Sequence, residues 1–214
     1  MARKTQKHLS DENGEETRQA ILRVAHELFM KYGYHAVTTR QLAEACGLTQ
    51  PALYHHFADK QALYLAMVTE EIAQMKVALE RIARRSEDIA ERLKHVATFL
   101  LSRNQHDLDL MLHDVRYELS PDARETLSTL FQNGVIAPIA AIFAEGQQGG
   151  ILREPGQGGL APFPAAYVFM NLLSRFATRS ARESSSDERP TNQTISADLT
   201  VQILLYGLAS DSKG

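Results

Sequence analysis

The fold is decided by residues 38–57, TTRQLAEACGLTQPALYHHF. Thr38, with a Gln three residues later, has the pattern of a capping box and predicts the start of a helix. Gly47 predicts the end of that helix. Thr49 then caps a second helix with Pro51 in its first turn, where a missing N–H costs nothing. Two short helices with this spacing predict a helix-turn-helix, in which the first helix supports the second.

The second of these helices has an outer face suited to double-stranded DNA. Leu53 and Phe57, four residues apart, are expected to face the core. An ordinary solvated face favours Lys and Glu, but the residues left outside here are uncharged: Gln50, Pro51, Ala52, Tyr54 and His55. Such a helix fits the DNA major groove. The alternative is a helical subdomain that touches no DNA, in which these are only solvated residues and the two threonines only caps.

The side chains on this outer face have distinct chemical uses. Gln50 can present a donor and an acceptor to an adenine edge, while Pro51 and Ala52 offer small apolar surfaces to a thymine methyl group. Tyr54 and His55 can donate to phosphate oxygens, which sets the register but reads no sequence.

The preceding helix and the next helix start add further candidates. Thr39 and Arg40 lie at a positive helix end and can approach phosphate, and Arg40 could instead reach a guanine. Lys60 would add another phosphate contact. The full set of predicted DNA-binding residues is Thr38, Thr39, Arg40, Thr49, Gln50, Pro51, Ala52, Tyr54, His55, His56 and Lys60.

The rest of the chain indicates an all-α protein with more than one domain. Its 214 residues are 44% apolar and 23% charged, which are ordinary globular values. Apolar residues at helical spacing predict a helix over 15–32. Asp59 caps a later helix that is too long to belong only to a three-helix N-terminal domain, which we call the head (residues 15–62). This long helix should therefore join two domains. Further helices are expected at 86–103, 107–118, 120–145, 164–179 and 195–209, with loops at 146–164 and 180–194.

Charge and composition limit the kind of partner and the compartment. The net charge of −3 argues against a protein that coats nucleic acid without discrimination. Residues 1–64 carry eight Lys and Arg against seven Asp and Glu, so the head is slightly more basic than the remainder. The sequence contains no run of eighteen apolar residues, so a membrane-spanning helix is not expected. No secretory signal is recognisable. We expect a cytoplasmic protein, in agreement with a single cysteine, Cys46.

Residues 17–63 resemble the N-terminal domain of the TetR (tetracycline-repressor) family of bacterial transcription regulators. The runs TTR at 38–40 and QPALYHH at 50–56 are especially similar to the repressor that gives the family its name. The other matching positions are Ile21, Leu22, Ala25, Leu28, Phe29, Gly33, Leu42, Ala43, Gly47, Leu48, Phe57, Lys60 and Leu63. The resemblance implies DNA contacts by Thr39, Arg40, Gln50, Pro51, Ala52, Tyr54 and Lys60.

The resemblance also implies an architecture and a function. It implies a DNA-binding domain at 15–62 and a helical effector-binding and dimerisation domain at 63–214. Separately, Arg3, Lys4 and Lys7 indicate a basic, flexible arm at 1–14 that could follow the minor groove or phosphates. The protein would be a homodimeric repressor of a palindromic operator, released by an unidentified small-molecule effector. The dimer would form through the last two helices, whose apolar residues extend over more than one face. The alternative for those residues is burial within one subunit, and the alternative for the arm is a solubilising tail.

A group of polar residues recurs at helical spacing in the second domain. These residues are His106, Asp109, His113 and Tyr117. Asp109 and His113 could share a metal ion, but a pocket wall or the surface is the favoured interpretation, and no metal site is predicted. The expected effector pocket consists of His106, Asp109, His113, Tyr117, Phe131, Phe169 and Leu173. Gly134 and Pro138 could open space for a ligand or only bend their helix.

Two other classes of protein are alternatives to a regulator. An enzyme is disfavoured, because the sequence has no Gly-rich phosphate loop after a strand, no Gly-x-Ser-x-Gly, no His-Glu-x-x-His and no paired cysteines. Catalytic residues and cofactors are therefore not expected, and the enzymatic alternative is a helical catalytic domain around His106, Asp109 and His113. The second alternative is a helical adaptor that binds only protein. Such a protein would not bind DNA and so would not change the mobility of any DNA duplex.

Overall fold

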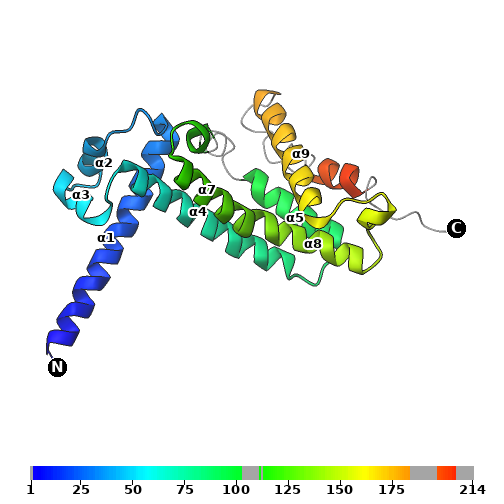
Figure 1. The fold of residues 1–214 in the computed structure, drawn as a ribbon, viewed down its shortest axis with the longest axis horizontal. Helices are drawn as coiled ribbons and strands as arrows, with labels where there is room; N and C mark the ends of the chain where they lie inside the picture. Colours follow the sequence, from blue (N-terminus) through cyan, green and yellow to red (C-terminus); the bar gives the residue numbers. More distant parts are fainter. Residues whose placement is uncertain (1, 103–110, 112, 184–196, 206–214) are drawn as a thin grey trace. The chain divides into compact units, whose positions relative to one another are not determined.

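The computed structural model describes residues 2–102, 111, 113–183 and 197–205. These residues form α-helices and their connections, and no strand is found among them, so the predicted all-α fold is confirmed. Figure 1 shows the order of the helices along the chain.

The chain divides into two compact units. Unit 1 contains Met1–Glu71 and His106–Ser128, and unit 2 contains Ile72–Gln105 and Thr129–Gly214. The first boundary lies inside one helix, α4 (Lys60–Ala83), which the sequence predicted as the connection between domains. We expected a single boundary after residue 62. The division differs in two ways: the first boundary lies after Glu71, and the later segment His106–Ser128 belongs to unit 1.

Unit 1 is built from α1 (Ala2–Tyr32), α2 (Thr39–Ala45), α3 (Gln50–His56) and the first half of α4. Figure 1 shows α2 and α3 next to each other, beside α1. Their buried side chains include Ile21, Leu22, Ala25, Phe29, Leu42, Leu53 and Leu63, which lie at the expected helical spacing. Tyr32, which continues the stripe of α1, is instead 54% exposed, and Met30, outside that stripe, is buried. The core of this unit therefore follows the helical periodicity of the sequence.

Helix α1 starts earlier than predicted. We expected a flexible arm at 1–14, but the backbone is helical from Ala2. The segment contains no proline, and Ala2, Arg3, Lys4, Gln6, Lys7, Leu9 and Glu12 favour a helix, whereas the run 10–14 includes weak helix formers and led to the expectation of a later start. Gly33 ends α1 as predicted, with a left-handed φ of 79° and its N–H bonded to the carbonyl of Phe29 at 2.8 Å.

The predicted caps of the next three helices are confirmed. Thr38 forms a full capping box with Gln41 at the start of α2. Thr49 Oγ1 accepts from Ala52 N at 3.3 Å at the start of α3. The carboxylate of Asp59 accepts from the backbone of α4 at 2.7 Å. Each cap satisfies a backbone N–H that has no partner within its helix, so the helix starts are fixed locally.

A buried carboxylate joins the segment 113–117 to the head. Asp114 is only 3% exposed, and its Oδ2 accepts from Tyr34 N at 2.9 Å and from Tyr64 OH at 3.4 Å. The rings of Phe29 and Tyr34 pack edge-on against Tyr64 at centroid distances of 5.0 and 5.1 Å. Burial, followed by the charge of Asp114, raises the pKa of Tyr64 above its ordinary value. The cluster therefore fixes the loop between α1 and α2.

A second link within unit 1 lies at the start of α7 (Pro121–Phe131). Gln61 Nε2 donates to Ser120 Oγ at 3.2 Å, and Ser120 N donates back to Gln61 Oε1 at 2.9 Å. Ser120 Oγ also accepts from Ala123 N at 3.4 Å, as expected for the predicted cap. The beginning of α7 is thus bonded to the first turn of α4.

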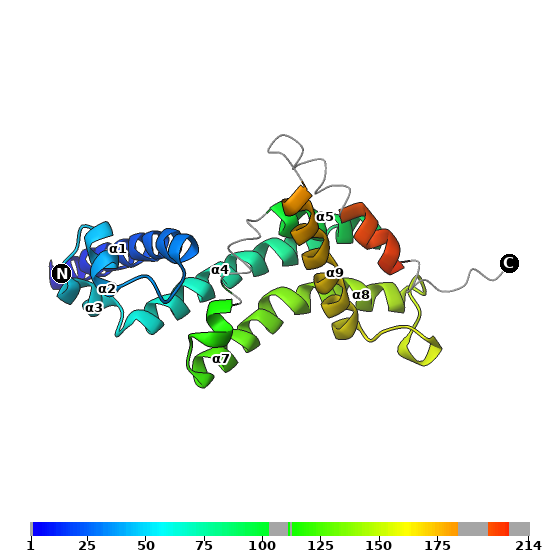
Figure 2. The same cartoon turned by 90° about the horizontal axis from the view of Figure 1, so that it is seen from above.

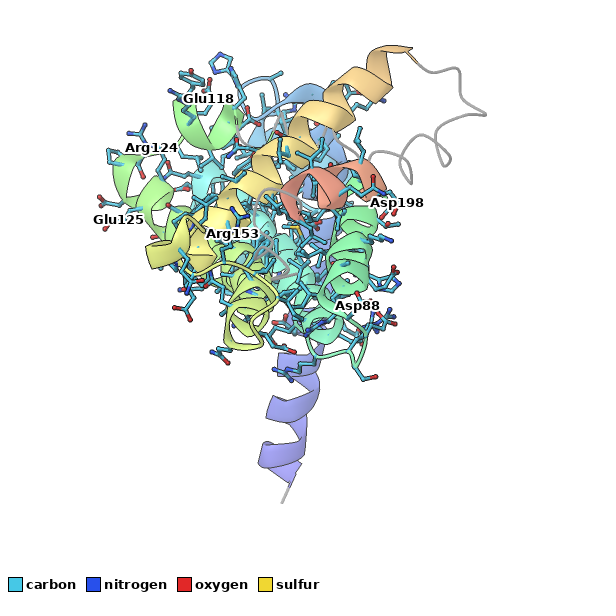
Figure 3. All side chains as sticks on the ribbon, turned by 90° about the vertical axis from the view of Figure 1, so that its right-hand side faces the viewer. Asp88, Glu118, Arg124, Glu125, Arg153 and Asp198 are labelled. Atoms are coloured by element: carbon cyan, nitrogen blue, oxygen red, sulfur yellow. The ribbon has the colours of Figure 1, made fainter. Side chains whose placement is uncertain are left out.

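Unit 2 is built mainly from α5 (Ile89–Ser102), α8 (Ala137–Gln148) and α9 (Pro162–Glu183), with a further helical segment at 197–205. Figure 2 shows α9 crossing α8. Helix α5 starts later than predicted because Asp88, labelled in Figure 3, is the cap and accepts from Glu91 N at 2.8 Å. Helix α9 starts at Pro162 and extends into the predicted loop at 180–194, whose later part lies outside the described residues.

The helix predicted over 120–145 is interrupted by a π-helical segment, Gln132–Ile136, between α7 and α8. Ala137 N–H bonds to the carbonyl of Gln132, five residues back. The wider turn directly precedes Pro138, which has no N–H to continue the α-helical pattern. A Cβ on Gly134 would lie 2.6 Å from Ile72 Cγ2. Gly134 therefore permits close packing on α4 and does not open space for a ligand.

The stretch Pro121–Gln148 is long and apolar enough to cross a membrane by length and composition, but half of its apolar window is buried inside the fold. Its buried side chains include Val135, Ile136, Ile139 and Phe143.

Arg92 bonds three helices of unit 2 together. Its side chain is 5% exposed and donates to Ala83 O at 2.8 Å, at the end of α4. The same guanidinium forms a two-pronged pair with Glu145 of α8, with N–O distances of 2.7 and 2.8 Å. This pairing lowers the pKa of Glu145 and raises that of Arg92. The C-terminal end of α4 is therefore held by a charge-assisted network.

We expect Asp114→Ala to destabilise unit 1 by about 1–3 kcal/mol, because the N–H of Tyr34 and the hydroxyl of Tyr64 would lose their acceptor. Chemical denaturation measures this change, and faster hydrogen exchange at the Tyr34 amide would locate it. His113→Ala is the matched control, since the His113 side chain is 60% exposed; it should change stability by less than about 0.5 kcal/mol. Equal effects of the two variants would contradict the assignment.

Candidate nucleic-acid interface

Helix α3 presents the predicted outer face. Leu53 and Phe57 are 2% and 6% exposed and point into the core, as expected from their spacing. Gln50, Pro51, Tyr54 and His55 are exposed, and Ala52 and His56 are half-buried at the sides of the helix. The rings of His55 and His56 pack edge-on at a centroid distance of 5.8 Å. The face is therefore available to an outside partner.

Thr39 connects this face of α3 to α2. Gln50 Nε2 donates to Thr39 Oγ1 at 3.3 Å, and Thr39 Oγ1 lies 3.2 Å from Tyr54 OH. The sequence predicted that each of these residues would contact DNA, but it gave no sign that they contact one another. The three side chains form one surface that spans both helices.

Thr38 and Thr49 have a structural role in this arrangement. Each hydroxyl oxygen accepts a backbone N–H as a helix cap, and Thr38 Oγ1 also donates to Gln41 Oε1 at 2.9 Å. Both threonines remain exposed. Contacts from either residue to DNA stay a prediction.

Arg40 is paired within its own helix. Its Nε donates to Glu44 Oε1 at 2.8 Å, and this hydrogen bond raises the pKa of Arg40. Both side chains are largely exposed. Sequence reasoning missed Glu44, although its four-residue spacing from Arg40 could have identified it. The pairing reduces the positive charge that Arg40 presents to an approaching phosphate.

Lys60 is also occupied by nearby groups. Its Nζ donates to Tyr34 O and to Val37 O, each at 3.0 Å, and lies 4.2 Å from the centroid of the Tyr34 ring. Burial lowers the pKa of Lys60. Two of its three N–H donors therefore close the loop between α1 and α2, a role that the sequence did not predict. A phosphate contact by the third donor stays a prediction.

The predicted effector residues that the structure describes are divided between the two units. Phe169 and Leu173 are buried in unit 2, where Phe169 packs edge-on against Phe143 at 6.2 Å. Phe131 is half-exposed at the end of α7. His113 and Tyr117 belong to unit 1, with exposed side chains whose rings lie 4.9 Å apart.

The remaining two members of the predicted pocket, His106 and Asp109, lie outside the described residues. In the part of the chain that the structure does describe, no group of three or more His, Cys, Asp and Glu side chains is placed to hold a metal ion.

The helix-turn-helix matches a known family model. Residues 21–67 match the model of the bacterial regulatory proteins of the tetR family. The chain is 44% identical over 59 residues to the transcriptional repressor AcnR of Corynebacterium efficiens, covering 28% of this chain and 31% of that protein. It is 50% identical over 50 residues to the class C tetracycline repressor of Escherichia coli, covering 23% of each chain. These matches span less than a third of the relatives' length.

A solved structure extends the similarity of the fold. The regulator FadR from Bacillus subtilis, solved in complex with stearoyl-CoA, superposes with a TM-score of 0.73 and 18% identity, covering 88% of this chain and 98% of that one. At this identity the likeness concerns the fold alone. Residues 21–67 are therefore similar to the N-terminal domain of the tetR family of bacterial regulatory proteins.

Proposed function

We propose that this protein is a cytoplasmic transcription regulator that acts as a homodimeric repressor of a palindromic operator and is released by a small-molecule effector. The observation that carries the proposal is the exposed surface formed by Thr39, Gln50 and Tyr54 within a helix-turn-helix of the tetR family. Its uncharged donors and acceptors suit the edges of bases and the oxygens of phosphates.

Helix α3 would lie in the major groove. Gln50 would hydrogen-bond a base edge, while Pro51 and Ala52 would contact a thymine methyl group. Tyr54 and Arg40 would bond phosphates and set the register. The two caps and the buried Leu53 and Phe57 hold the helix with this face outward, so binding requires no refolding of the head.

A second copy of the chain is the proposed partner for the apolar surface of unit 2. Phe163, Tyr167 and Val168 of α9 are 39–42% exposed, and Leu199 and Ile203 in the segment 197–205 are 41% and 47% exposed. The spacing of four residues places Leu199 and Ile203 on one side of their helix. Large apolar side chains gathered on a surface are typical of protein interfaces.

The same segment is bonded to the rest of unit 2. Asp198, labelled in Figure 3, lies 3.6 Å from Lys94 Nζ of α5. Dimerisation through this surface would pair two recognition helices, which can read half-sites about 34–36 Å apart with greater specificity than one helix.

The effector would bind among the apolar helices of unit 2 and act through α4. This helix contributes Lys60–Glu71 to unit 1 and Ile72–Ala83 to unit 2. A ligand that shifts α4 would favour a state of the heads that fits the operator less well. The resulting change in operator affinity cannot exceed the ligand's differential affinity for the two states.

Stearoyl-CoA, the ligand in the FadR structure, is the first compound to test against an operator complex. Operator release on titration supports the switch, and unchanged affinity with bound ligand contradicts it.

Selection of bound duplexes from a random pool tests DNA recognition and dimer symmetry together. We expect an inverted repeat with half-site centres about 10–10.5 base pairs apart, or a multiple of this. Gln50→Ala should mainly relax the preference at one position per half-site, whereas Tyr54→Ala should weaken binding to most sequences. Failure of the wild-type chain to shift any duplex at physiological salt would favour a protein-binding adaptor, and a single asymmetric site would contradict the dimer.

Tyr167→Glu should convert the dimer to a monomer, because it places a charge in the proposed apolar interface. Analytical ultracentrifugation measures the change in mass, and operator affinity should fall with it. Val77→Glu is the matched control, since Val77 is a 68% exposed apolar residue of α4 outside that surface. A wild-type monomer, or dissociation by Val77→Glu alone, would place the contact elsewhere.

Glu44→Gln should strengthen binding to non-specific DNA and steepen its salt dependence, because Arg40 would lose its carboxylate partner. Release of about one additional counterion would change the slope of log K against log salt by up to about 0.9. Binding isotherms at several salt concentrations measure this slope. Thr126→Val, on α7, serves as a control for a polar substitution away from the outer face of α3. An equal slope for Glu44→Gln and wild type would show that the pairing with Glu44 does not limit the contact of Arg40 with phosphate.

A further inference from the structure

The hydroxyl of Thr39 is the middle member of a hydrogen-bond chain that joins α2 to α3. Gln50 Nε2 lies 3.3 Å from Thr39 Oγ1, and Tyr54 OH lies 3.2 Å from the same oxygen. Thr39 is half-buried between the two exposed side chains. Because all three residues belong to unit 1, the chain is part of the head itself.

The direction of the bond between Gln50 and Thr39 follows from the groups involved, whereas either hydroxyl can donate in the bond between Thr39 and Tyr54. An amide nitrogen can only donate, so the Thr39 oxygen accepts from Gln50. The hydroxyl of Thr39 keeps its own proton, and the oxygen of Tyr54 lies within reach of it. Donation in this direction leaves the phenolic proton of Tyr54 for an acceptor outside the protein.

This arrangement leaves each end of the chain with the groups that DNA recognition requires. A glutamine that reads adenine uses one N–H and its carbonyl oxygen. Gln50 has a second N–H and its Oε1 beyond the bond to Thr39, so it can make both contacts without breaking that bond. Tyr54 can donate its proton to a phosphate oxygen.

We propose that Thr39 is a positioning residue for base recognition, which orients Gln50 and Tyr54 before DNA binds. The proposal rests on the proposed function and goes beyond a phosphate contact by Thr39. A side chain that is already oriented loses less freedom on binding. Base preference at the position read by Gln50 therefore depends on a hydroxyl that need not touch the base.

Thr39→Val removes the hydroxyl but keeps the shape, and Thr39→Ser keeps the hydroxyl. Affinities are measured for the selected operator and for operators substituted at the position that Gln50→Ala relaxes. With Thr39→Val, the discrimination between preferred and substituted bases should fall by about 3- to 10-fold, which is the effect of one ordinary hydrogen bond. Thr39→Ser should remain within about twofold of wild type.

Two results would overturn the proposal. A uniform loss of affinity with unchanged base discrimination would assign Thr39 to phosphate alone. Thr39→Ser behaving like Thr39→Val would assign the effect to packing of the methyl group. Similar unfolding midpoints for the three proteins would show that neither variant acts by unfolding the head.

A measurement on the free protein separates this proposal from the proposed function. Nuclear magnetic resonance relaxation of the Gln50 side-chain amide should report an ordered group in wild type and Thr39→Ser, and a more mobile one in Thr39→Val. Unchanged mobility in Thr39→Val would overturn the hydrogen-bond chain even if DNA binding is found. A wild-type protein that selects no duplex would overturn the proposed function, whatever the order of this amide.

Discussion

The capped starts of α2 and α3 are the constraint on which the rest of the head depends. The hydroxyls of Thr38 and Thr49 satisfy backbone donors that would otherwise be left without partners, and Gly47 adopts a φ of 66° in the turn between them. Because both helix starts are fixed within a few residues, the outward direction of Gln50 and Tyr54 is set by local chemistry. The buried Leu53 and Phe57 then hold that direction against the core.

The features that the sequence predicted well are those determined over short distances. Caps, glycine stops and apolar stripes lie within a few residues of the structures they specify, so α2, α3 and the start of α4 are where they were expected. The outer face of α3 was predicted for the same reason. Only two neighbouring apolar residues, Leu53 and Phe57, were needed to decide which side is buried.

The features that the sequence did not reveal depend on long-range contacts or on competition between partners. Asp114 meets Tyr34 across 80 residues of chain, and no local pattern specifies such a pair. Lys60 was expected to face phosphate, but two backbone carbonyls and an aromatic ring already surround it. His113 and Tyr117 share a helix face as predicted, but helical spacing alone does not determine whether that face borders a cavity or solvent.

The bond from Arg92 to the last carbonyl of α4 has a mechanical consequence. Ala83 is held to α5 and α8 through Arg92, so the C-terminal end of α4 cannot shift within unit 2 without breaking these hydrogen bonds. A ligand that displaces this part of unit 2 works against the same charge-assisted network, so the anchor adds to the free-energy cost of any rearrangement there.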